Sequence, residues 1–224
     1  CLLRSAAVLK SAGGMAGGAG KAMGPFSRLC CGPCSNAVTA SARLATVRGR
    51  PADPHASMFI HITGASGSGT STLGAALAAE LGCAFLEADD FFWLPTEPPF
   101  HARRPEAERR SLLLAAMAQS GSAVVSGSVS GWGAEIENGF DHIVFLYVDS
   151  ALRLERLRVR ELQRFGKVNP AFLTWAAQYD EGPPEGRSLA RQKAWLAVRN
   201  CPVLVLEGDL STQERLARIR QWRA

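Results

Sequence analysis

A glycine-rich stretch, residues 64–72, constrains the fold of this chain more than any other feature of its sequence. It reads Gly64-Ala65-Ser66-Gly67-Ser68-Gly69-Thr70-Ser71-Thr72 and lies between the apolar residues 58–63 and a helical pattern over residues 73–81. A strand, a tight glycine loop and a helix in this order turn successive backbone N–H groups inward, next to the positive end of the helix dipole. Such a nest binds anions. The stretch therefore predicts a phosphate-binding loop.

The loop matches the P-loop spacing G-x-x-x-x-G-K-[ST] with one departure. Gly64 and Gly69 occupy the glycine positions, and Ser71 occupies the position of the hydroxyl that binds magnesium. Thr70 stands where a P-loop has its lysine, whose ammonium reaches the β- and γ-phosphates. Without that charge the loop must hold phosphates by backbone N–H groups. The pattern thus predicts phosphate binding more directly than it predicts phosphoryl transfer.

The charge of the chain is divided unevenly near residue 57. Residues 1–57 hold seven Lys and Arg and one acid, a net charge of +6, whereas residues 58–224 hold 18 basic and 19 acidic residues, a net charge of −1. A nearly neutral folded part argues against a nucleic-acid-binding surface. The chain also has no apolar run close to the roughly 20 residues of a membrane span. We expect neither nucleic acid nor a membrane as a partner.

Residues 1–57 form a leader rich in Ala, Gly, Ser and Arg, without a periodic pattern that could bury a core. This composition predicts a mitochondrial or chloroplast transit segment. The alternative is that Met58 is the true start, which places the protein in the cytoplasm. In either case we expect residues 58–224 to form the folded domain.

Strand and helix patterns alternate through residues 58–224. We expect strands over residues 58–63, 83–87, 122–126, 142–148 and 202–207, and helices over residues 70–81, 150–165, 170–181, 185–200 and 211–222, with a further helix around residues 112–114. This alternation predicts an α/β fold of three layers, a five-stranded, mainly parallel sheet with helices on both faces.

Two acids follow the second predicted strand. Asp89 and Asp90 would lie at the carboxyl edge of the sheet, where ligands of parallel α/β proteins bind. One could act as general base and the other, Asp90 with Ser71, as a magnesium ligand. A helix cap or solvated turn is the alternative. The third predicted strand, in contrast, ends in small and hydroxyl residues, where many P-loop proteins have an aspartate that orders magnesium.

Arginines form the remaining candidate site residues. Arg156, Arg160 and Arg164 recur at every fourth position of one predicted helix and so share a face. Because like charges at this spacing repel, the cluster favours phosphate contact, although a solvated face beside Glu155 and Glu161 is the alternative. Substrate contacts are expected from Arg103 and Arg104 after a proline-rich segment, and from Arg187, which would lie in the first turn of a helix and oppose its dipole.

Together these segments resemble the nucleoside- and nucleotide-kinase branch of the P-loop NTPases, both adenylate-kinase-like and shikimate-kinase-like. They are also similar to small bacterial proteins known as AAA-family ATPases or adenylate kinases. The resemblance covers residues 58–209 and rests on residues 62–70, 89–95, 126–128, 153–157, 160–161 and 187–188. It implies ATP binding and transfer of the γ-phosphate to a small acceptor. By likeness to uridine kinases, Asp89 would be the base, Asp90 would assist through magnesium, and the helix with Arg160 would be a lid.

The sequence thus predicts a monomeric small-molecule kinase that uses ATP and Mg²⁺ and phosphorylates a nucleoside-like, nucleotide-like or other hydroxyl acceptor. The alternative is a degenerate P-loop protein that binds nucleotide for regulation with little catalysis. Thr70 and the missing strand-end aspartate favour the regulatory protein. Asp89, Asp90 and the aligned arginines favour the kinase, because a pure binder needs no base.

Overall fold

The computed structural model describes residues 57–97, 100–182 and 186–224, so the predicted leader lies, except for Ser57, outside the described residues. The strands are β1 (Phe59–Gly64), β2 (Ala84–Glu87), β3 (Ala123–Ser126), β4 (His142–Tyr147) and β5 (Val203–Glu207). The helices are α1 (Thr70–Leu81), α2 (Ala88–Phe92), α3 (Glu106–Ser120), α4 (Ala134–Glu137), α5 (Ser150–Phe165), α6 (Pro170–Ala177), α7 (Leu189–Ala197) and α8 (Thr212–Arg223).

The strands form one sheet in the order β2-β3-β1-β4-β5, and every neighbouring pair is parallel. β1 is therefore central, with Ile60 paired to Val124 of β3 and to His142 of β4. All carboxyl ends meet at one edge, and the glycine loop leaves the middle of that edge. The expected α/β fold with a parallel sheet is confirmed.

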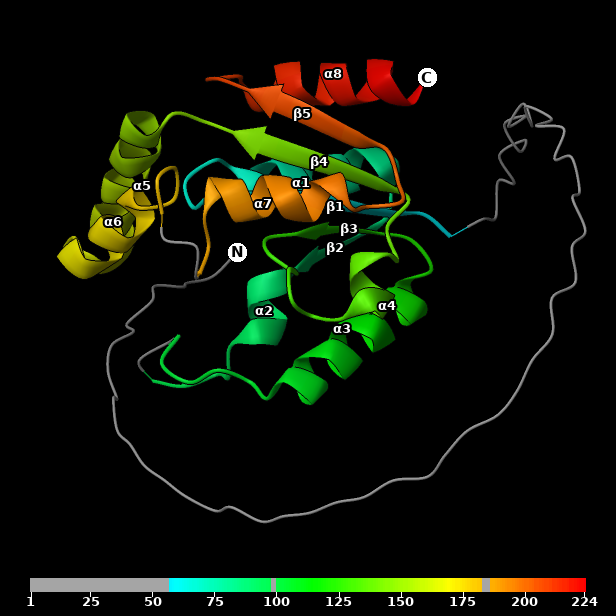
Figure 1. Ribbon diagram of the computed structural model, residues 1–224, viewed down its shortest axis with the longest axis horizontal. Coiled ribbons are helices and arrows are strands. Elements are labelled where there is room, and N and C mark those ends of the chain that lie inside the picture. Colours follow the sequence, from blue (N-terminus) through cyan, green and yellow to red (C-terminus); the bar gives the residue numbers. More distant parts are fainter. Residues whose placement is uncertain (1–56, 98–99, 183–185) are drawn as a thin grey trace, which may run out of the picture. The chain divides into compact units, whose positions relative to one another are not determined.

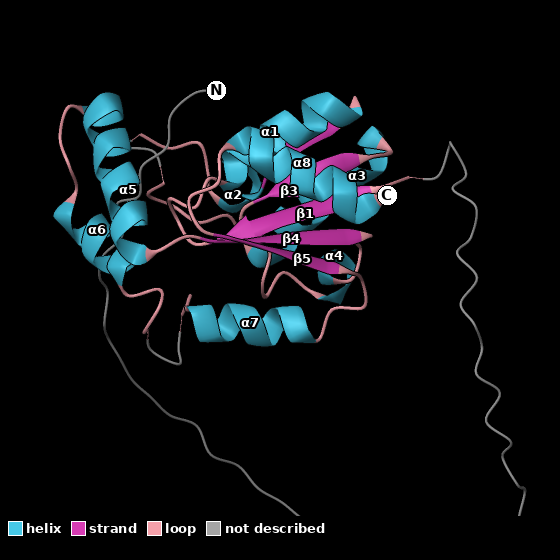
Figure 2. Cartoon of the chain, turned by 90° about the horizontal axis from the view of Figure 1, so that it is seen from above, coloured by secondary structure: helices cyan, strands magenta, loops and turns pink. Residues whose placement is uncertain are grey.

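Helices cover both faces of the sheet, which gives three layers (Figures 1 and 2). On one face, Ile60 and Ile62 of β1 pack with Leu77 of α1 and Ile219 of α8. The opposite face carries a second core with residues of α3, α4 and α7. Burial on both faces explains why the strands are nearly continuous in apolar residues. Helices α5 and α6 stand apart, beyond the carboxyl edge (Figure 2).

Local sequence signals set several helix ends as predicted. Helix α1 ends at Leu81 because Gly82 adopts the left-handed conformation (φ 64°) that favours glycine. Helix α8 starts with the expected capping box, in which Ser211 and Glu214 each bond the other's backbone N–H. No helix within the described ranges is long and apolar enough to cross a bilayer.

The start of α7 differs from the prediction and moves a candidate residue. The helix begins at Leu189, not at residue 185, because Ser188 is the N-cap and its hydroxyl accepts from the Arg191 N–H at 3.3 Å. Arg187 therefore precedes the helix instead of lying in its first turn. Its side chain reaches the glycine loop, where it donates to Gly64 O at 2.9 Å.

Candidate phosphate-binding site

The glycine loop between β1 and α1 has the backbone of an anion nest. Gly67 and Gly69 have φ angles of 86° and 93°, in the left-handed region that disfavours other residues. A Cβ at position 64 would lie 2.6 Å from the carbonyl oxygen of Leu146 in β4, so only glycine fits where the chain leaves the sheet. The first turn of α1 contains no acid, which leaves its unpaired N–H groups available to an anion.

Four arginines of the described residues donate hydrogen bonds to backbone carbonyl oxygens of the loop, and we call them the arginine collar. They come from α5, from the residue before the Ser188 cap and from α8. The donor–acceptor pairs, with N···O distances, are Arg187–Gly64 (2.9 Å), Arg153–Ser66 (3.5 Å), Arg156–Gly67 (3.5 Å) and Arg215–Ser68 (2.8 Å). Because these donors hold the carbonyl oxygens, the loop is fixed in one conformation. Two of the four guanidiniums are paired with carboxylates, Arg153 with Asp180 and Arg156 with Asp209.

Arg153 is the structural member of the collar. It is completely buried, and its guanidinium also donates to Val148 O at 2.9 Å and to Ala176 O at 3.4 Å. An ion pair with Asp180 at 2.9 Å neutralises it. Removing one partner of such a buried pair is strongly destabilising, because the other charge is left buried and uncompensated. Arg153 therefore joins α5, α6 and the loop into one unit.

Arg215 is buried with less compensation. It is 5% exposed, its Nε has no hydrogen-bond partner in the described part of the chain, and none of the carboxylates there forms an ion pair with it. Desolvation lowers the pKa of its guanidinium, as does the nearby charge of Arg156, while the charge of Asp209 acts in the opposite direction. A Cβ at Gly69 would lie 3.0 Å from its Nη1, so this charge sits one residue from Thr70. An anion bound in the loop would offset the buried positive charge of Arg215.

Glu87 is a site residue that sequence reasoning missed. It ends β2, and its carboxylate interacts with the hydroxyl of Ser71, the residue at the magnesium position of the loop. Burial raises its pKa, and the charges of Asp89 and Asp90 raise it further. One available signal was its position, because a charged residue that ends an apolar parallel strand lies at the ligand-binding edge.

The predicted acids Asp89 and Asp90 are exposed in the first turn of α2, and one buried residue, Ala88, separates them from Glu87. Desolvation lowers the pKa of Arg160, as does the charge of Arg164, while Glu161 and Asp89 act in the opposite direction. The structure thus brings Asp89 near Arg160 as well as near Glu87. Among the described residues no cluster of three His, Cys, Asp or Glu side chains is arranged to hold a metal by itself.

The other predicted arginines take different positions. Arg164 is exposed in the last turn of α5, whereas Arg160 packs over the Phe172 ring of α6 at 5.8 Å. Arg104 donates to Phe91 O at 3.0 Å and to Glu108 at 2.5 Å. These bonds join the end of α2 to α3.

Arg103 lies over the Phe92 ring at 5.8 Å. The substrate role of Arg103 and Arg104 stays a prediction, since these contacts show only a structural role.

Comparison with known proteins places the chain in a family. No protein-family model matches it. It is 42% identical over 170 residues to the uncharacterized protein YqaC of Bacillus subtilis (strain 168), a match that covers 71% of this chain and 94% of YqaC. The chain belongs to the YqaC family. Membership of this family does not by itself indicate an activity for the chain.

Solved structures with similar folds include two shikimate kinases. The enzyme from Bacteroides thetaiotaomicron is 22% identical, with a TM-score of 0.46 over 74% of this chain and 97% of its own. The enzyme from Acinetobacter baumannii, in complex with shikimate, is 17% identical, with a TM-score of 0.48 over 75% and 93%. The fold itself, a P-loop kinase-like α/β fold, follows from the parallel strand order and the loop after β1. These matches lend no support to the narrower adenylate-kinase or AAA-family resemblance.

Proposed function

We propose that this protein is an ATP-dependent small-molecule kinase whose phosphate loop works without a lysine because arginines supply the missing charge. The observation behind this proposal is Arg215, a buried guanidinium without an ion pair that lies against Gly69 and donates to Ser68 O. A protein that merely lost its lysine would have no reason to bury a second, poorly compensated charge beside the vacated position.

The residues at this site are suited to bind a nucleoside triphosphate together with Mg²⁺. The loop N–H groups and the start of α1 would hold the phosphates, with Arg156 and Arg160 closing from α5. Ser71 would hold the metal, and Glu87, which already interacts with that hydroxyl, would orient it together with Asp90. A site without its own carboxylate cluster fits a cation that arrives with the phosphates. When bound, Mg²⁺ offsets the negative charge of the phosphate oxygens.

In the proposed reaction the acceptor hydroxyl oxygen bonds to the γ-phosphorus while the bond from that phosphorus to the bridging oxygen of ADP breaks. Asp89 takes the hydroxyl proton, since it is exposed to solvent and lies within the electrostatic reach of Arg160. The acceptor is a small molecule held with the help of Arg187, and we propose that the enzyme acts as a monomer without nucleic acid or membrane. It would act in an organelle if residues 1–57 are a transit segment and otherwise in the cytoplasm.

A second candidate function is nucleotide-dependent regulation without catalysis. The observation that favours it is Ser126, which ends β3 where an aspartate would order magnesium. In that case the loop and collar would bind ATP, and the protein would signal its occupancy.

ADP release in the presence of nucleosides, nucleotides and small hydroxy acids tests the kinase proposal. We expect one acceptor class to raise turnover of the full chain above ATP hydrolysis alone. Asp89→Asn should remove this stimulation while leaving ATP affinity within about twofold, because the base acts on the acceptor. ATP binding with no acceptor-dependent turnover in any class would favour the regulatory function.

A further inference from the structure

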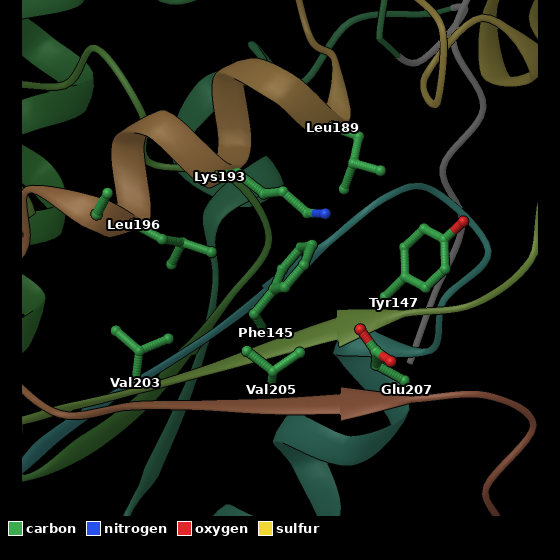
Figure 3. Close-up of a pocket in the computed structure, with 9 residues that line it drawn as sticks. Phe145, Tyr147, Leu189, Lys193, Leu196, Val203, Val205 and Glu207 are labelled. Atoms are coloured by element: carbon green, nitrogen blue, oxygen red, sulfur yellow. The ribbon is translucent and has the colours of Figure 1, made fainter.

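A cavity of about 500 Å³ lies between α7 and the strands β4 and β5, of which β5 is the edge strand, and no residue of the phosphate loop lines it (Figure 3). Its sheet wall includes Phe145, Val203 and Val205, and its helix wall includes Leu189 and Leu196. This volume lies within the range of roughly 300–1,000 Å³ typical of small-molecule sites, and its walls are mainly apolar as in such sites.

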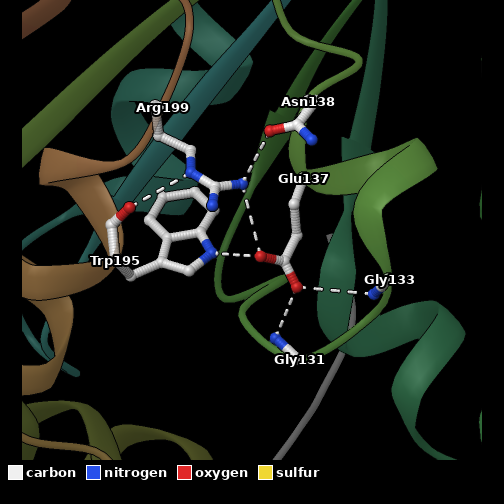
Figure 4. Close-up of polar contacts among 6 residues, drawn as sticks. All are labelled: Gly131, Gly133, Glu137, Asn138, Trp195 and Arg199. Atoms are coloured by element: carbon white, nitrogen blue, oxygen red, sulfur yellow. Dashed lines mark hydrogen bonds and ion pairs between the residues drawn. The ribbon is translucent and has the colours of Figure 1, made fainter. Parts of the chain in front are cut away.

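The helix cannot close the cavity by moving onto β5, because its far end is anchored elsewhere (Figure 4). Trp195 donates its indole N–H to Glu137 Oε2 at 2.6 Å, and Arg199 forms an ion pair with the same oxygen at 3.3 Å. The charged side chains are only 13% and 9% exposed, so separating them would leave a buried charge unpaired. Val205 on the edge strand consequently remains 48% exposed below the helix.

Two charged side chains of opposite sign, Lys193 and Glu207, line the otherwise apolar cavity. Lys193 extends from α7 and directs its ammonium group between the apolar walls, whereas Glu207 projects from the end of β5 (Figure 3). Neither side chain forms an ion pair with another described residue. A phosphate would need several cationic or N–H donors, while a single ammonium with a carboxylate nearby suits an anion of one charge.

We propose that this cavity is a second binding site that takes a small amphipathic carboxylate. The apolar body of the ligand would pack against Phe145, Val203 and Leu196, and its carboxylate would pair with Lys193. Burial of the apolar part supplies most of the affinity, and the ammonium selects the anion over a neutral molecule of the same shape. The proposal stands apart from the kinase function, because it needs neither nucleotide nor turnover.

An NMR titration of the full chain with octanoate tests the site directly. We expect saturable shifts of residues in α7, β4 and β5, with 1-octanol binding more weakly. Lys193→Ala should weaken octanoate binding about fivefold, and Glu207→Gln should tighten it because a repulsive charge is removed. Lys167→Ala, at an exposed lysine distant in sequence from the cavity, is the matched control and should change nothing.

A variant that fills the space distinguishes the cavity from a general surface effect. Ala197 lines the helix wall and is exposed, so Ala197→Trp should fold normally and abolish octanoate binding. Unchanged binding in both Lys193→Ala and Ala197→Trp would overturn the proposal. So would a dimer of the parent chain that Ala197→Trp converts to monomer in sedimentation, since the apolar face would then be an interface between copies.

Discussion

At position 70, we propose, other side chains offset the absence of a lysine. A lysine there contributes a charge whose benefit grows as the transferred phosphoryl group leaves. In this chain Thr70 begins α1, and the guanidinium of Arg215 lies next to Gly69, one residue earlier. Arg215 belongs to α8, so the charge comes from behind the loop and not from within it.

Replacing Arg215 should reveal this charge. We expect Arg215→Ala to weaken ATP binding about tenfold or more, because it removes both the charge and the bond that holds Ser68 O. Arg215→Lys should recover part of the loss. Isothermal calorimetry measures the affinity, and Arg218→Ala, at an exposed site of the same helix, is the control. Equal affinity for ATP in Arg215→Ala and the parent would remove Arg215 from the site.

Restoring the lysine gives a second test. If the collar already supplies the charge, Thr70→Lys should raise kcat by less than about threefold, or lower it, because the new ammonium would add a second positive charge close to that of Arg215. In the Arg215→Ala background the same lysine should help more. A tenfold or larger rise in kcat in the otherwise unchanged protein would show a crippled kinase and contradict a loop adapted to work without lysine.

At the scale of secondary structure, α7 and the residue before its cap contact two other parts of the molecule, the glycine loop and α4. The residue before its cap, Arg187, donates to Gly64 O of the loop, and its last turn is tied to α4 through Glu137. Glu137 also accepts from the backbone N–H of Gly131 at 2.8 Å, which fixes the loop after β3. A single buried carboxylate thus sets the position of a helix and of a neighbouring loop.

Removing the charge of Glu137 should therefore destabilise the fold strongly. Glu137→Gln keeps the shape of the side chain but leaves the buried guanidinium of Arg199 without its counter-charge. We expect a loss of about 3 kcal/mol in the free energy of unfolding, measured in urea. Glu135→Gln, on the exposed side of the same short helix, should cost under about 0.5 kcal/mol. Similar values for the two variants would mean that the network contributes little.

At the scale of the whole molecule, a histidine in the core makes the free energy of unfolding depend on pH. His61 of β1 is fully buried, stacks on Phe140 at 4.7 Å between ring centroids and has its Nδ1 3.1 Å from Val125 O. Burial lowers its pKa from 6.5 to about 4. The unfolded chain therefore binds a proton between these values that the folded chain does not bind, so stability falls as pH falls from about 6.5 to 4.

His61→Leu should flatten this dependence. One pKa unit corresponds to about 1.4 kcal/mol, so the parent should lose about 3 kcal/mol through His61 between pH 7 and pH 4. The raised pKa of Glu87 acts in the opposite direction, since the contribution of this group to the free energy of unfolding increases as pH falls. The difference between parent and variant, measured by urea unfolding at each pH, isolates the histidine. Parallel curves for the two proteins would contradict the argument.

Local patterns in the sequence were enough to predict the sheet, the loop and the bounds of α1 and α5, because glycines, caps and apolar periodicity act over a few residues. Arg156 and Arg187 were candidate site residues, but their bonds to the loop carbonyls, and the part played by Arg215, were beyond such reasoning. Arg187 and Arg215 meet the loop across 123 and 147 residues of chain, a pairing that depends on how α7 and α8 pack. Glu87 was missed for a different reason, since a strand-ending acid reads first as part of its strand.

The distance between the loop and Arg215 along the chain has a consequence for biosynthesis. A ribosome makes the glycine loop early and Arg215 only in the final helix, so a nascent chain that has emerged as far as β5 lacks the guanidinium that holds Ser68 O. Until α8 docks against α1, the loop lacks one of the four guanidinium donors that hold its carbonyl oxygens. Nucleotide capture should therefore appear late in translation, and ATP bound by a stalled chain would report that the last helix is already in place.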